Sequence, residues 1–155
     1  MSKKKLKFGD VVAAAKQVEQ NVPFWALVLA GEAAGEGEQG LRAVASVMYN
    51  RAKKGRKYWG GSDLDSVARQ KGQFSAATLP KPRLMKRYLE VKPIVDRIVQ
   101  EIKTGRFKSN LPDYVTYYWR YDIDQKMRKQ PWTKNLGTYK RIGNHIFYYE
   151  RRDKK

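Results

Sequence analysis

Residues 21–31 read NVPFWALVLAG and form the only long stretch of the chain that carries no charged side chain. From Pro23 to Ala30, apolar residues fill every face of a helix. This pattern predicts a helix that is buried on all sides rather than one that lies on the surface. We expect Asn21 to cap this helix, Pro23 to lie in its first turn, and the helix to reach about Ala34.

Glu32 follows this stretch directly, at a position where a buried helix should stay apolar. Burying a carboxylate without a partner costs several kcal/mol, or it raises the pKa of the group until the group is neutral. A carboxyl group that stays protonated near neutral pH is what a general acid for glycosidic bond cleavage requires. The sequence therefore predicts that Glu32 is such an acid.

Composition restricts the classes of protein to which the chain can belong. A chain of 155 residues with 41% hydrophobic residues suits one folded domain over residues 1–155. There is no cysteine, and His145 is the only histidine, so disulfides, thiolate metal sites and His-pair metal sites are excluded. We expect neither a metal nor an organic cofactor. No secretory segment or membrane span is evident, so we expect another route to deliver the protein to any wall outside the cytoplasm.

The charge of the chain is +18, and it is unevenly distributed. Residues 1–50 hold six Lys or Arg and five Asp or Glu, which gives +1, and residues 51–155 hold 27 and 10, which gives +17. We interpret residues 1–8 as a flexible basic arm and residues 150–155 as a basic tail. Such a surface attracts polyanions: nucleic acid, anionic membranes, or a cell wall with its carboxylates and phosphates.

Periodicity and turn residues predict the other elements. Helices are expected over 11–20, 38–54, 62–69 with Ser62 as the cap, and 81–104 with a break at Pro93. A strand is expected over 115–119, a long loop over 120–136, and two short strands around a Gly-Asn turn within 140–149. These elements predict an α+β fold, mainly helical, with a small antiparallel sheet at its C-terminal end.

Four blocks of the sequence together resemble a known family. They are GEAAGE at 31–36, GLRAVASV at 40–47 followed by Asn50 and Arg51, QFS at 73–75, and IGNHIFY at 142–148. In this order they resemble the SleB-type cell-wall hydrolases, the spore cortex-lytic enzymes and their phage relatives. The resemblance implies a lysozyme-like domain that cleaves the MurNAc–GlcNAc bond of peptidoglycan. It also implies that Glu32 is the catalytic acid/base.

The number of candidate catalytic carboxylates helps to distinguish a hydrolase from a lytic transglycosylase. Ordinary glycoside hydrolases place two carboxyl groups across the scissile bond, and no second carboxylate stands out beside Glu32. A lytic transglycosylase needs only one, because the muramyl C6 hydroxyl of the substrate acts as the nucleophile and closes a 1,6-anhydro ring. We therefore favour a transglycosylase over a hydrolytic muramidase that uses the same Glu32.

Several further residues are candidates for substrate binding: Glu36, Gln73, Phe74, Ser75, Tyr117, Tyr118, Trp132 and His145. Gln73 and Ser75 could bind sugar amides, orient Glu32 or cap a turn. Tyr117 and Tyr118 could stack on a sugar ring or pack within a strand, and alternation along a strand allows only one of them to face a cleft.

The remaining candidates also have structural alternatives. Trp132 could form a cleft wall or an ordinary anchor, and His145 could be a turn or core residue. Glu36 could support Glu32, shape the following loop or face solvent. Asn50 and Arg51 are expected to tie the helix over 38–54 to a neighbouring loop.

Two other classes of function compete with the enzyme. A nucleic-acid-binding module would use the cationic two-thirds with its interleaved aromatic residues, but no helix-turn-helix, zinc-finger or RNP pattern is present. A membrane-disrupting protein would use the basic arm and tail, but residues 110–136 lack an amphipathic helix. We expect a monomer whose partner is peptidoglycan, with contacts to outer-membrane or teichoic phosphates and no specific nucleic acid. A lysin that is phage-encoded or associated with a virion fits best.

Overall fold

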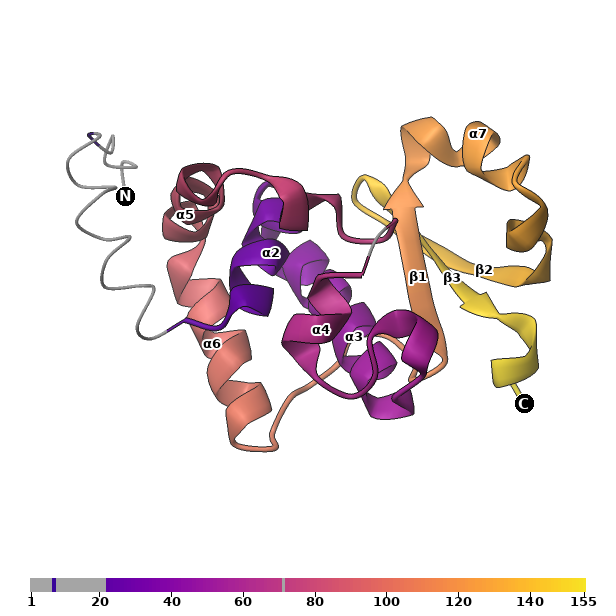
Figure 1. Ribbon diagram of the computed structural model, residues 1–155, viewed down its shortest axis with the longest axis horizontal. Helices are drawn as coiled ribbons and strands as arrows, with labels where there is room; N and C mark the ends of the chain where they lie inside the picture. The colour runs from indigo at the N-terminus through magenta and orange to yellow at the C-terminus, as the bar shows by residue number, and fades with distance from the viewer. Residues whose placement is uncertain (1–6, 8–21, 71) are drawn as a thin grey trace.

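The computed structural model describes residues 7, 22–70 and 72–155, and it confirms the α+β class. A helical body and a three-stranded sheet lie side by side (Figure 1). The elements are α2 (Phe24–Ala33), α3 (Gly37–Lys54), α4 (Leu64–Ala68), α5 (Lys81–Glu90), α6 (Lys92–Lys103), β1 (Val115–Arg120), α7 (Asp124–Arg128), β2 (Leu136–Ile142) and β3 (His145–Glu150). The helix expected over 11–20 and the cap expected at Asn21 lie outside the described residues.

Helix α2 lies at the centre of the helical body, as its uncharged sequence predicts. Every residue from Trp25 to Gly31 is buried, and α3, α4, α5 and α6 all pack against this helix. The helix begins two residues later than expected: Pro23, and not Asn21, occupies the N-cap position, with an extended backbone, and is not in the first turn. Burial on all sides explains why no polar face is present in this segment.

Helix α4 begins at a different cap from the one expected. The cap is Asp63, whose carboxylate accepts hydrogen bonds from the backbone N–H and the hydroxyl of Ser66, so the assignment of Ser62 was wrong. Asp63 is the N-cap because its carboxylate accepts a hydrogen bond from a free backbone N–H of the first turn. Asp65 has a different partner: its carboxylate accepts from the backbone N–H of Trp25, at the start of α2.

The break between α5 and α6 confirms the expected effect of Pro93. Proline cannot donate a backbone hydrogen bond, and its ring clashes with the carbonyl four residues earlier. The predicted helix over 81–104 is therefore two helices, which meet at Val91, with Pro93 in the first turn of α6. The break redirects the chain, so that α5 and α6 both pack on α2.

The sheet has the strand order β1-β3-β2, and all its strands are antiparallel. Gly143 and Asn144 form the turn between β2 and β3, as expected, although β2 begins at Leu136 rather than near Lys140. Gly143 has a φ of +58°, in the left-handed region that favours glycine.

The prediction of a long loop over 120–136 was wrong. This segment contains α7 and two 3-10 turns, Tyr121–Ile123 and Pro131–Asn135. Asp124 explains the difference, because its carboxylate accepts hydrogen bonds from Trp119 in β1 and Tyr148 in β3. These contacts hold α7 on the sheet, and one of them comes from Tyr148, which is 24 residues away in the sequence.

Asn50 and Arg51 tie helix α3 to strand β1 and to Pro112 in the loop before it, whereas a neighbouring loop alone was expected. Asn50 donates to the carbonyls of Pro112 and Val115 at 2.9 Å each, and Nε of Arg51 donates to the carbonyl of Thr116 at 2.6 Å. These bonds position β1 against the helical body. Among the described residues, no helix has the length and apolarity that a bilayer-spanning segment needs.

The close packing around Gly31 gives a test of the fold. A Cβ atom at Gly31 would lie 2.6 Å from Leu84 Cδ2 and 2.8 Å from Ala76 Cβ, whereas one at Gly35 would meet nothing within 4 Å. We expect Gly31→Ala to lower the free energy of unfolding by about 1–3 kcal/mol through overpacking. Gly35→Ala should stay within about 0.5 kcal/mol of the wild type. Urea unfolding of both variants measures this, and equal effects would contradict the packing described.

Candidate active site

Glu32 lies at the C-terminal end of α2, where the helical body meets the sheet. Its Oε1 accepts a 2.7 Å hydrogen bond from the Tyr118 hydroxyl on β1. Its Oε2 is 3.4 Å from both the Ser75 hydroxyl and the backbone nitrogen of Ala76. The carboxyl group is therefore held by one short hydrogen bond on one oxygen and two long ones on the other.

Burial raises the pKa of Glu32 above its ordinary value. The hydrogen bonds from Tyr118, Ala76 and Ser75 and the positive charge of Arg87 all act in the opposite direction. Desolvation is the largest of these effects, so the carboxyl group holds its proton to a higher pH than an exposed glutamate does.

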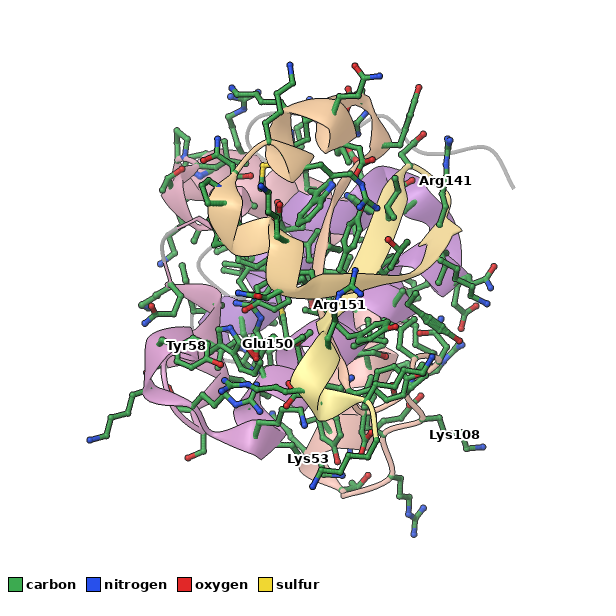
Figure 2. The ribbon with its side chains drawn as sticks, turned by 90° about the vertical axis from the view of Figure 1, so that its right-hand side faces the viewer. Lys53, Tyr58, Lys108, Arg141, Glu150 and Arg151 are labelled. Carbon is green, nitrogen blue, oxygen red and sulfur yellow. The ribbon has the colours of Figure 1, made fainter. Side chains whose placement is uncertain are left out.

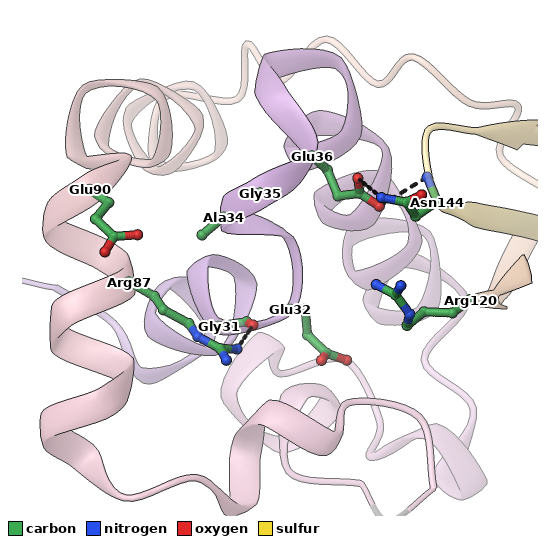
Figure 3. A pocket seen from close by; sticks show the side chains of 9 residues that line it. All are labelled: Gly31, Glu32, Ala34, Gly35, Glu36, Arg87, Glu90, Arg120 and Asn144. Atoms are coloured by element: carbon green, nitrogen blue, oxygen red, sulfur yellow. Dashed lines mark hydrogen bonds between the residues drawn. The ribbon is translucent and has the colours of Figure 1, made fainter. Parts of the chain in front are cut away.

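A pocket of about 300 Å³ opens beside Glu32 (Figure 3). Arg87 on α5 and Arg120 at the end of β1 lie on either side of Glu32, and Arg87 donates a hydrogen bond to the carbonyl of Gly31. Sequence reasoning missed both arginines. Arg87 stands three residues after the apolar Leu84 on the same helix, and that spacing could have placed it on the side that faces the core.

Glu36 closes the opposite side of this pocket. Its side chain is only 7% exposed, and it accepts hydrogen bonds of 3.1 Å from the backbone nitrogen and the side-chain amide of Asn144. A Cβ atom at Gly143 would lie 3.1 Å from the Glu36 carboxylate, so the turn can approach this closely only with glycine there. Glu36 thus holds the β2–β3 turn against the start of α3.

His145 is buried beside Glu36 and behind Tyr118. Its Nδ1 lies 3.1 Å from Glu36 Oε1, but the orientation is not that of a hydrogen bond, so the two groups form an ion pair only when the imidazole is protonated. Burial lowers the pKa of His145, Glu36 raises it, and Arg120 lowers it. Burial dominates, which favours the neutral imidazole. The ring packs edge-on against Tyr118, so His145 supports the residue that contacts Glu32.

The segment Gln73–Ser75 reaches Glu32 through its last residue only. Both ends of the Gln73 amide are already bonded, the nitrogen to the Tyr118 carbonyl and the oxygen to Arg51 Nη2, at 2.8 Å each. Phe74 is 2% exposed and packs near Tyr118 and Arg51. The expectation that Phe74 contacts substrate does not fit this burial. Gln73 is likewise engaged in positioning the segment.

The two tyrosines of β1 point in different directions, as strand alternation requires. Tyr118 is 4% exposed and bonds to Glu32, so its ring is not available for stacking on a sugar. Tyr117 lies among Trp59, Trp132 and Arg51 and lines a different pocket. The structure thus brings Ser75 and Tyr118 to Glu32, with Glu36 across the same pocket. It does not bring Tyr117 or Trp132 there.

No cluster of His, Asp or Glu that could hold a metal ion occurs in the part of the chain that the structure describes.

A comparison with protein families decides the class of the protein. The family model described as Cell Wall Hydrolase matches residues 35–148, well over half of the chain. The chain belongs to the Cell Wall Hydrolase family. It is therefore an enzyme that acts on peptidoglycan. The matched region begins three residues after Glu32, so family membership by itself assigns no role to that residue. No curated protein and no solved structure matches the chain.

The raised pKa of Glu32 predicts how the stability of this cell wall hydrolase depends on pH. A carboxyl group with a raised pKa stabilises the folded state below its unfolded pKa, and this stability is lost as pH rises through the folded pKa. Glu32→Gln removes that loss. We expect the variant to gain stability relative to the wild type as pH rises above the ordinary pKa of a glutamate, about 4.3, and through the raised pKa of Glu32.

Urea unfolding across this range measures the difference between the two proteins. Glu38→Gln, at an exposed position on α3, controls for the loss of one negative charge from a cationic protein. A difference between Glu32→Gln and wild type that stays constant with pH would contradict the raised pKa.

The Tyr118 hydroxyl offers a second test of the same site. Its hydrogen bond lowers the pKa of Glu32, so Tyr118→Phe should raise that pKa further. Tyr117→Phe is the matched control, because the Tyr117 hydroxyl bonds with Trp59 and Glu150 and not with Glu32. A ¹³C NMR titration of the glutamate carboxyl groups measures the change. Equal pKa values of Glu32 in the two variants would show that the hydrogen bond is not formed in solution.

Proposed function

We propose that this cell wall hydrolase cleaves the β-1,4 bond between MurNAc and GlcNAc as a lytic transglycosylase, with Glu32 as its single acid/base. The observation that carries the proposal is the environment of Glu32: a desolvated carboxyl group with a raised pKa at the edge of an open pocket. A group of this kind keeps its proton to a higher pH than an exposed carboxyl group and is suited to release it to a leaving oxygen.

The two oxygens of Glu32 differ in a way that suits the acid step. Oε1 accepts the short bond from Tyr118, whose own pKa burial raises well above its usual range, so the tyrosine stays a donor. Oε2 has only contacts of 3.4 Å, longer than an ordinary hydrogen bond. We assign the proton to Oε2. In the first step it moves to the glycosidic oxygen as the bond from C1 to that oxygen breaks.

The second step uses the carboxylate that the first step leaves. Tyr118, Ser75 and the backbone of Ala76 donate to this carboxylate, and the charge of Arg87 stabilises it. In the proposed step the carboxylate takes the proton from the muramyl C6 hydroxyl while O6 bonds to C1. This closes the 1,6-anhydro ring and returns Glu32 to its protonated form, so one carboxyl group serves both steps.

The other carboxylates that line the pocket support a mechanism with one carboxyl group. Glu36 is bonded to the Asn144 turn and contacts His145. Glu90 lies on α5 beyond Arg87, which separates it from Glu32 in Figure 3. A retaining or inverting hydrolase would need a second carboxyl group across the scissile bond. A muramidase in which Glu32 activates water remains the second candidate, because the pocket is open to solvent.

The cationic surface supports binding to a negatively charged wall. Lys53, Lys108 and Arg141 are exposed, and they extend outward in Figure 2. Such charges concentrate a protein at a surface that carries teichoic or outer-membrane phosphates. We propose that the protein works as a monomer on the wall, delivered as a phage or bacterial lysin. The family match gives no support to the alternative of a nucleic-acid-binding module.

The products of peptidoglycan digestion test the proposed function. Purified protein would be incubated with sacculi, and the released muropeptides identified by mass spectrometry. We expect 1,6-anhydro-muramyl ends from the wild type and at least a hundredfold loss of release in Glu32→Gln, since general acid catalysis contributes about 10²–10⁴-fold. Glu36→Gln should retain activity much closer to the wild type, because its carboxylate holds the Asn144 turn.

Each alternative gives a different result in this experiment. Reducing muramyl ends would make the enzyme a muramidase. A loss in Glu36→Gln as deep as that in Glu32→Gln, with the fold intact by circular dichroism, would indicate a mechanism with two carboxyl groups. Full activity in Glu32→Gln would overturn the assignment of the acid.

A further inference from the structure

A second pocket, of about 220 Å³, lies beside the candidate active site. Tyr58, Trp59, Tyr117 and Trp132 form its aromatic walls, and Arg51 and Gln73 also line it. It shares no lining residue with the pocket beside Glu32. Neither the general acid nor its hydrogen-bond donors use this second pocket.

The walls of this pocket expose aromatic surface to solvent. Tyr58 is 53% exposed and Trp132 is 47% exposed, which makes them two of the four large hydrophobic side chains exposed in the described part of the chain. They stand at the two ends of a row of rings whose neighbouring centroids are 5.1, 5.7 and 5.9 Å apart, Tyr58–Trp59–Tyr117–Trp132. Packing within the row orders these rings before any ligand arrives, which lowers the entropy cost of binding.

Arg51 is the charged group of this pocket, and it has no carboxylate partner. Its side chain is nearly inaccessible, at 3% exposed, and its guanidinium lies 4.8 Å from the ring centre of Tyr117 and 5.0 Å from that of Trp59. Nε donates to the Thr116 carbonyl and Nη2 to Gln73. Nη1 makes no hydrogen bond within the described residues. Burial lowers the pKa of Arg51 to about 10, so the group still carries its charge and its donors at neutral pH.

Glu150 holds one wall of the pocket in place, although it does not line the pocket. It accepts hydrogen bonds from the Tyr58 hydroxyl at 2.9 and 3.0 Å and pairs with Arg56, and Figure 2 shows Tyr58 and Glu150 side by side. The aromatic walls and the Arg51 donors together favour a ligand that combines a flat apolar face with a hydrogen-bond acceptor.

We propose that this pocket is a separate saccharide subsite, which binds one N-acetylated pyranose ring of the glycan strand away from the bond that is cut. The C–H face of the ring stacks on Trp132, and the acetamido carbonyl accepts from Nη1 of Arg51. This inference rests on the proposed glycan substrate. The volume of the pocket suits one sugar ring, and Nη1 of Arg51 donates to no residue that the structure describes, so it can donate to an acceptor of this kind.

The position of the pocket relative to Glu32 supports this assignment. Gln73 and Tyr117 line the pocket, whereas Ser75 and Tyr118, on the same two segments, bond to Glu32. A glycan strand is a polymer, so binding energy from a distant ring can position the ring that reacts. The subsite thus contributes to affinity for long strands and leaves the acid/base chemistry unchanged.

The test uses ¹⁵N-labelled Glu32→Gln protein, which should bind glycan without cutting it. Chitotetraose would be added while the indole N–H signals of the four tryptophans are followed by NMR. We expect the signals of Trp59 and Trp132 to shift and that of Trp25, in the core, to stay. Adding Trp132→Ala should weaken binding about tenfold, and Trp132→Phe should restore most of it.

Tyr121→Ala is the matched control, because Tyr121 is 44% exposed but packs under Arg141, away from the pocket. It should leave the affinity unchanged. With Glu32 intact, Trp132→Ala should raise KM for soluble glycan strands while kcat stays near that of the wild type.

Three results would overturn the subsite: unchanged affinity in Trp132→Ala, no indole shift with chitotetraose, or shifts produced only by a sugar-free stem peptide or an oligonucleotide. The subsite and the proposed function fail separately. Chitotetraose binding at Trp132 without any release from sacculi would refute the function and keep the subsite. Release of anhydro-muropeptides without chitotetraose binding at Trp132 would support the proposed function and refute the subsite.

Discussion

The hydrogen bond between Tyr118 and Glu32 joins the helical body to the sheet at the point where the chemistry is proposed to occur. Glu32 ends the buried helix α2, and Tyr118 belongs to the first strand. The bond stabilises the charged form of the carboxyl group, while burial favours the neutral form. Because burial prevails, this carboxyl group holds its proton to a higher pH than an exposed glutamate does. This is the balance that acid/base chemistry by a single carboxyl group requires.

Three further contacts keep this interface in place. Arg51 and Asn50 bind β1 to α3, Gln73 bridges Arg51 and the Tyr118 backbone, and Glu36 holds the β2–β3 turn. Each of these bonds joins residues that lie far apart in the sequence. Losing one such partner leaves a desolvated polar group, which costs about 1–3 kcal/mol. The geometry around Glu32 thus depends on a network rather than on a single bond.

The same network separates the two pockets. Tyr117 and Tyr118 are neighbours on β1 but face different sides, and the segment that begins at Gln73 contributes to both sites. Position along an extended strand decides which tyrosine serves which site. Two adjacent residues can therefore have unrelated roles, one in orienting the acid and the other in the aromatic wall of the proposed subsite.

Local sequence patterns determined much of the fold. The uncharged stretch before Glu32 predicted the central helix, Pro93 predicted the break between α5 and α6, and the Gly-Asn pair predicted the turn between β2 and β3. These features depend on periodicity and on backbone restrictions that act within a few residues. The same reasoning placed a carboxyl group at the end of a buried helix, and that was enough to mark Glu32 as a candidate acid.

Tertiary structure decided the rest, because those features depend on pairs of residues that are distant in the chain. Asp124 anchors α7 through Tyr148, which is 24 residues away and lies outside the pattern of residues 120–136. The burial of Phe74, the approach of Arg87 to the site and the partner of Glu36 likewise depend on how the helices and the sheet pack. The sequence by itself determined that Glu32, a polar residue, lies at the end of a buried helix. Only the packing of distant segments decided which hydrogen bonds and charges surround its carboxyl group.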